Sequence, residues 1–146
     1  MAWWDVFDVS ASGLAAERLR MDVIAENLAN ANTTRTAAGG PYRRKVVVFA
    51  PQEPEPVFSS ILRKELSSKG RGVKVERIAE DQSPFRQVYD PGHPDANAEG
   101  MVTLPNVNTV LEMVDLIAAT RAYEANLAAL NTARTMASQA LELGRG

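Results

Sequence analysis

The sequence contains no cysteine, only one histidine and no long uninterrupted apolar stretch. Without cysteine, disulfides, thiolate metal sites and cysteine nucleophiles are excluded. No stretch approaches the roughly 18 apolar residues that a membrane-spanning helix needs. The net charge is −2, so no overall field attracts nucleic acid or an anionic membrane. What remains is the composition of a globular protein, with 45% hydrophobic and 23% charged residues in a 146-residue chain of one-domain size.

The N-terminus also lacks the features of a cleavable secretory signal. The first residues, MAWWDVFDVSASG, carry no Lys or Arg, and Asp5 and Asp8 interrupt the apolar stretch. If the protein leaves the cytoplasm, we expect another route to carry it.

Helical periodicity is present near the start of the chain. Residues 5–32 form a predicted helix with Ser10 or Ser12 as a candidate N-cap, and an Asn-, Thr- and Gly-rich stretch then ends it. Apolar side chains recur there every seven residues, at Phe7, Leu14, Met21 and Leu28, and Ile24 adds to the same face.

A second, longer helix is predicted from about Pro105 to Leu143, with Asn106 or Asn108 as its cap. At 1.5 Å per residue it would be roughly 55 Å long, which is longer than so small a domain needs. Its seven-residue repeat is Leu116, Tyr123, Leu130 and Ala137, and the stripe is widened by Val110, Met113, Val114, Ile117, Leu127 and Leu141. A single partner helix cannot cover this stripe, so we expect a second apolar face to contact other subunits.

The middle of the chain has strand and loop patterns. Residues 45–49, 72–78 and 85–90 predict three strands, whereas 51–56 predict a loop and 59–70 are ambiguous. The sequence therefore predicts an α+β fold. Its N- and C-terminal helices pair as a coiled-coil-like hairpin, parallel or antiparallel, from which a small β-rich segment projects. The expected divisions are an N-terminal helix at 1–36, a β-rich middle segment at 37–104 and a long C-terminal helix at 105–146.

His93 is the first candidate for chemistry. It lies in the turn-rich stretch YDPGHPDANAEG beside Asp90 and Asp95, where a metal site or a His–Asp pair is conceivable. No G-x-S-x-G elbow accompanies this lone histidine, and a turn shaped by Pro91 and Pro94 explains it better.

Other candidate sites are equally weak. The adjacent Glu80 and Asp81 point in opposite directions if they end a strand, so they do not form an acid–base pair. The basic run at 42–45 might contact phosphates, but protection of a strand edge fits the negative net charge better. The glycines at 39–40 and 70–72 lack the G-K-[ST] and the following helix of a phosphate loop. We expect no catalytic, cofactor-binding or metal-binding residue.

Two Asn- and Ala-rich decamers, NLANANTTRT at 27–36 and NLAALNTART at 126–135, match at seven of ten positions. Chance similarity between Ala-rich helices is one interpretation. The other is that both decamers occupy similar environments in an array of packed helices, where Ala permits close approach and Asn sets the register.

The stretch SASGLAAERLRMDVIAENLANANTTRT at 10–36 resembles the N-terminal signature shared by bacterial flagellar rod and hook proteins. Residues 39–49, 72–108 and 112–143 resemble the proximal-rod members of this axial protein family, and YDPGHPDAN followed by PNV is the most specific feature. The resemblance covers most of the chain and leaves out 50–71.

This resemblance implies a structural subunit without enzymatic activity that polymerises into the rod of the bacterial flagellar basal body, in the periplasm. Such a rod is the drive shaft that transmits motor torque, and it encloses the export channel. Subunits of the family pass through the flagellar type III export apparatus without signal cleavage. The expected partners are further copies of the chain, other rod proteins and that apparatus. No cofactor, nucleic acid, small-molecule substrate or membrane insertion is expected.

Nine residues on the two helices are the candidate assembly interface: Leu14, Met21, Ile24, Leu28, Val114, Ile117, Tyr123, Leu127 and Leu130. The alternatives are a distal-rod or hook-type axial subunit, a helical-hairpin module that captures one partner helix, and a metal-dependent hydrolase using His93, Asp90 and Asp95. The short middle segment argues against a larger axial subunit. A one-to-one complex would indicate the binding module, and stoichiometric metal would indicate the hydrolase.

Overall fold

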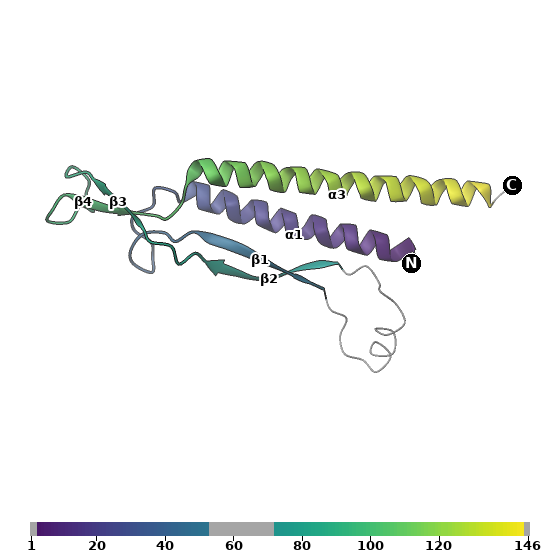
Figure 1. The fold of residues 1–146 in the computed structure, drawn as a ribbon, viewed down its shortest axis with the longest axis horizontal. Coiled ribbons are helices and arrows are strands. Elements are labelled where there is room, and N and C mark those ends of the chain that lie inside the picture. Colours follow the sequence, from purple (N-terminus) through teal and green to yellow (C-terminus); the bar gives the residue numbers. More distant parts are fainter. Residues whose placement is uncertain (1–2, 53–71, 145–146) are drawn as a thin grey trace, which may run out of the picture.

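The computed structural model describes residues 3–52 and 72–144 (Figure 1). The N-terminal helix α1 spans Trp3–Ala29, and the C-terminal helix α3 spans Thr109–Leu143. They lie side by side and antiparallel, so both ends of the chain are at the same end of the pair. The α+β fold with paired terminal helices is confirmed, and the pairing is antiparallel rather than parallel.

The two helices pack along a seam with the spacing of a coiled coil. On α3 the less exposed positions alternate at intervals of four and three residues: Glu112, Leu116, Ala119, Tyr123, Asn126, Leu130, Ala133 and Ala137. The matching series on α1 is Ser10, Gly13, Glu17, Arg20, Ile24 and Asn27. Asn27 bonds Glu112, and Gly13 lies against Asn126. These contacts are two heptads apart on both helices, so the register does not slip between them.

Gly13 is the point of close approach within this seam. A Cβ placed on Gly13 would lie 3.0 Å from Nδ2 of Asn126. We therefore expect Gly13→Val to overpack the seam and lower the free energy of unfolding by about 1–3 kcal/mol. Urea unfolding measures this change. Adding Asn126→Ala should recover much of the loss, and a double variant no more stable than Gly13→Val would show that Asn126 is not the obstacle.

The start of α1 differs from the sequence expectation. Ser10 and Ser12 are not N-caps, because α1 begins at Trp3 and runs through both. Ser12 instead ties the start of β2 (Val73–Glu80) to the helix: its Oγ donates to the carbonyl of Val9 at 2.7 Å and accepts from the amide of Val73 at 3.0 Å. A Cβ on Gly72 would lie 2.5 Å from this Oγ, so glycine alone fits there.

The start of α3 is set by Asn108, one of its two candidate caps. Asn108 is extended, and its side chain accepts hydrogen bonds from the amides of Val110 and Leu111. Asn106 has a different role. Its Oδ1 accepts from the amide of Arg44 at 2.8 Å, and its Nδ2 donates to the carbonyl of Asp81 at 3.0 Å. The segment before Asn108 therefore connects to the strands instead of extending α3.

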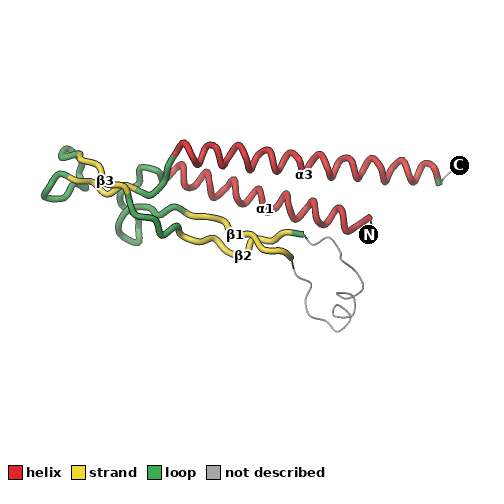
Figure 2. The backbone as a smooth tube through the Cα atoms, in the orientation of Figure 1, coloured by secondary structure: helices red, strands yellow, loops and turns green. Residues whose placement is uncertain are grey.

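The strands form two separate antiparallel hairpins (Figure 2). β1 (Lys45–Pro51) pairs with β2 and lies along α1, with a register shift between Val48 and Phe49. β3 (Arg86–Tyr89) pairs with β4 (Met101–Leu104) beyond the ends of the helices. This middle segment positions the polar residues described below against both helices.

The expectation of three strands was wrong, because it missed β4. Four residues are too few for a clear alternating pattern, although Val102 within β4 is only 2% exposed. The turn before β4 takes its left-handed residue at Gly100, with φ of 76°. The loop expected at 51–56 and the ambiguous stretch at 59–70 lie largely outside the described residues.

Candidate assembly surface

The nine candidate interface residues fall into two groups. Ile24 is buried within the chain, at 5% exposure, and five more are half-buried: Leu14, Met21, Leu28, Tyr123 and Leu130. The other three, Val114, Ile117 and Leu127, are exposed on α3, with exposed fractions of 57%, 57% and 41%. The role of all nine in assembly stays a prediction, but only the exposed group has substantial surface left for another chain.

Val114 and Ile117 belong to a larger apolar surface at the start of α3. It comprises Val110, Leu111, Met113, Val114 and Ile117, each at least half exposed, and we call it the α3 patch. It remains exposed because α1 contacts α3 only along the seam. Monomeric proteins rarely leave large contiguous apolar surfaces in water, so such a surface indicates a contact with another chain.

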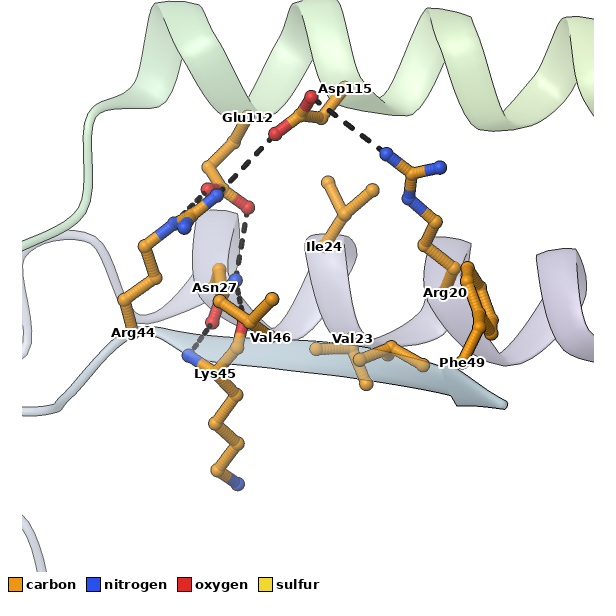
Figure 3. Close-up of a pocket in the computed structure, with 11 residues that line it drawn as sticks. Arg20, Val23, Ile24, Asn27, Arg44, Lys45, Val46, Phe49, Glu112 and Asp115 are labelled. Carbon is orange, nitrogen blue, oxygen red and sulfur yellow. Dashed lines mark hydrogen bonds and ion pairs between the residues drawn. The ribbon is translucent and has the colours of Figure 1, made fainter. Parts of the chain in front are cut away.

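A buried polar junction fixes this end of α3 in place (Figure 3). Glu112 is 1% exposed, although it carries a carboxylate. Its Oε2 accepts from Nδ2 of Asn27 at 3.0 Å, and its Oε1 accepts from Nε of Arg44 at 2.6 Å. Asn27 is equally buried, and it also donates to the carbonyl of Lys45 and accepts from the Lys45 amide. These bonds join α1, β1 and α3 at one point.

Arg44 is the only cation within 4.0 Å of Glu112 in the described part of the chain, and it reaches two further carboxylates. Its guanidinium lies 3.5 Å from Asp81 and 3.4 Å from Asp115. Burial by itself lowers the pKa of Arg44, but the hydrogen bonds to Glu112 and Asp81 outweigh it and raise the pKa above the usual value. Hydrogen bonds from Ser83, together with Arg44, lower the pKa of Asp81. Arg44 and Asp81 therefore remain a charged pair at neutral pH.

Tyr42 gives the junction a pH dependence in the alkaline range. Its hydroxyl donates to Oδ1 of Asn27 at 3.0 Å, and burial, followed by nearby Glu26 and Glu112, raises the pKa of Tyr42 to about 12. An unfolded tyrosine titrates near pH 10, so this contribution to stability is complete below pH 10 and is lost as pH rises to about 12. The shift corresponds to about 3 kcal/mol.

We expect Tyr42→Phe to remove this alkaline step. The variant should be about 1 kcal/mol less stable near neutral pH, because the bond to Asn27 is lost. Between pH 10 and 12 its free energy of unfolding should then fall less steeply than that of the unaltered protein. Urea unfolding across this range measures both slopes, and equal slopes would show that another group causes the loss.

Sequence reasoning missed the junction. Arg44 was assigned only to a basic strand edge, and Asn27 only to a repeated decamer. Glu112 had a usable signal, because it lies one step before Leu116 in the seven-residue repeat of α3. A carboxylate at a seam position requires a partner, and the spacing alone does not show which distant residue supplies it.

The structure gives His93 a local role. Its Nδ1 accepts from the amide of Asp95 at 3.1 Å, and Asp95 in turn bonds Thr34 at 2.7 Å and lies 3.1 Å from Arg35. Within 3–52 and 72–144, no group of three His, Cys, Asp or Glu residues could hold a metal ion. None of the described helices is both long and apolar enough to span a bilayer.

The two decamers adopt different structures, which corrects the expectation of similar environments within this chain. The first leaves α1 at Ala29 and continues as turns, whereas the second lies wholly inside α3. They do share one feature: Asn27 and Asn126, the first residue of each, both face the other helix at the seam. Asn at these two positions is therefore explained by helix pairing.

Comparison with known proteins matches both helices to flagellar families. Residues 7–35 match the family described as "Flagella basal body rod protein", and residues 98–143 match "Flagellar basal body rod FlgEFG protein C-terminal". These ranges contain most of α1 and all of α3.

Full-length relatives agree with these matches. The chain is 51% identical to the flagellar basal-body rod protein FlgC of Bacillus subtilis, over 94% of this chain and 95% of that protein. It is 43% identical to FlgC of Borreliella burgdorferi over the whole of both chains. It is 41% identical to FlgC of Salmonella typhimurium over 99% of this chain and 100% of that protein. Identity at this level, along nearly the whole length, extends through both helices and the strands between them, so the chain belongs to the FlgC family of flagellar basal-body rod proteins.

Proposed function

We propose that the chain, by its family a structural subunit of the flagellar basal-body rod, polymerises through its terminal helices. The observation that carries this proposal is the α3 patch, an apolar surface at least half exposed at every member. Burial of such a surface against a neighbouring subunit would contribute roughly 25 cal/mol for each Å² removed from water.

The hairpin is suited to this role because its ends are tied together internally. The junction at Glu112 and the close approach at Gly13 hold α1 and α3 in one register. A rigid element transmits force without the subunit changing shape, which a torque-bearing drive shaft requires. The rod would enclose the export channel, and other rod proteins and further copies of the chain would be its neighbours.

The proposal assigns the chain no catalytic activity and a periplasmic position within the rod. Export through the flagellar type III apparatus, without cleavage of a signal, would bring it there. Purified basal bodies test this route. The chain recovered from the rod should have an N-terminus at Met1 or Ala2, and export should stop in a strain that lacks a working apparatus. Cleavage further inside the chain, or continued export in that strain, would rule this route out.

A further inference from the structure

The C-terminal end of α3 has exposed apolar and basic side chains. Figure 1 shows α3 extending past the N-terminus of α1. We call residues 134–143 the α3 tail. Met136, Leu141 and Leu143 are 55%, 73% and 83% exposed there. Arg134 is exposed as well, and it forms no ion pair with any residue of the described ranges.

The opposite end of α3 has a groove of complementary character. It has a volume of about 340 Å³ and opens beside Leu111 and Val114 of the α3 patch. Its charged lining is Asp81, Glu112 and Asp115 against a single guanidinium, that of Arg44. Arg20 approaches Asp115 only to 4.0 Å, and the Asp115 side chain is 40% exposed. The groove therefore combines apolar walls with an excess of negative charge.

We infer that the α3 tail of one copy docks on the groove and α3 patch of a second copy. Arg134 would lie against Asp115 and Asp81, and the apolar side chains of the tail would cover the patch. The tail supplies the unpaired cation that the groove lacks, and the patch supplies the apolar surface that the tail lacks. This inference rests on the proposed function of the chain as a polymerising rod subunit.

The two surfaces cannot meet within one chain. They lie at opposite ends of a helix of 35 residues, which is roughly 50 Å long. A contact between two different surfaces is heterologous, and it leaves one free surface at each end of the assembly. Head-to-tail docking can therefore continue along the helix axis, whereas a two-fold dimer would occupy both surfaces and stop.

Disulfide trapping in purified protein tests the docking, because the chain has no native cysteine. The Leu111→Cys, Leu141→Cys double variant should form a ladder of cross-linked oligomers on oxidation, at a rate that rises with protein concentration. Each single variant should form little or none. Efficient dimers from Leu141→Cys alone, or no ladder above a Leu111→Cys, Gln87→Cys control, would overturn the inference.

Charge reversal separates docking from a folding defect. Arg134→Glu in the double-cysteine background should slow the ladder about fivefold, the size expected for loss of one exposed ion pair. Adding Asp115→Lys should restore the rate, with helix content by circular dichroism unchanged throughout. Failure of the restoring change would show that these two residues do not meet. If Ile117 is protected in assembled rods and no ladder forms, the rod function stands and the tail is not the neighbour.

Discussion

Arg44→Met is expected to lower the free energy of unfolding by about 3–5 kcal/mol, because it leaves the carboxylate of Glu112 buried without its counter-charge. Glu112 is 1% exposed and accepts only from Arg44 and Asn27 within the described residues. Folded domains of this size are typically stable by 5–15 kcal/mol, so the loss is a large fraction of the total. Urea unfolding followed by helical circular dichroism measures it.

The matched control removes both charges. In Arg44→Met, Glu112→Leu the buried carboxylate is gone, and replacing a buried ion pair by apolar groups is often neutral or stabilising. Asn27 keeps its bonds to the backbone of Lys45. The double variant should therefore be more stable than Arg44→Met. A cost below about 1 kcal/mol for Arg44→Met would mean that Glu112 is not buried and paired as described.

Ile117→Asp is expected to abolish rod assembly and motility while leaving the isolated hairpin intact. Ile117 is 57% exposed in the single chain, so the change should alter the free energy of unfolding by about 0.5 kcal/mol or less. At an interface the same carboxylate would be buried without a partner, at a cost of several kcal/mol in each contact. The repeated contacts of a polymer multiply that cost.

Motility on soft agar and the yield of purified basal bodies measure the effect in a strain with the variant as its sole copy. Ile117→Leu is the matched control, because it keeps the apolar volume and should preserve motility. Leu127→Asp should act in the same direction, since Leu127 is 41% exposed on the same helix. Normal swimming by the Ile117→Asp strain would show that this face of α3 remains in water.

The parts of the fold that depend on local periodicity could be predicted from the sequence. The seven-residue repeats predicted two paired helices, and the excess width of the second stripe predicted the exposed face at Val114 and Ile117. The cap at Asn108 was one of two predicted options. These features rest on residues within a few turns of one another, which a single sequence displays directly.

The polar junction could not be predicted in the same way. Asn27, Arg44 and Glu112 are distant in sequence, and the hydrogen bonds between them exist only once α1, β1 and α3 have packed. Spacing identifies the face on which a residue lies, but it does not identify a partner elsewhere in the chain. The short strand β4 was missed for a different reason, since its pairing with β3 carries the information that its own four residues lack.

The central claim is that the α3 patch becomes covered when the chain joins the rod. The most direct test is maleimide labelling of Ile117→Cys, the only thiol in such a variant. The purified subunit should label rapidly, because position 117 is exposed. In isolated basal bodies the same thiol should be protected until the rods are denatured. Equal labelling of the purified subunit and the intact basal bodies would contradict the claim.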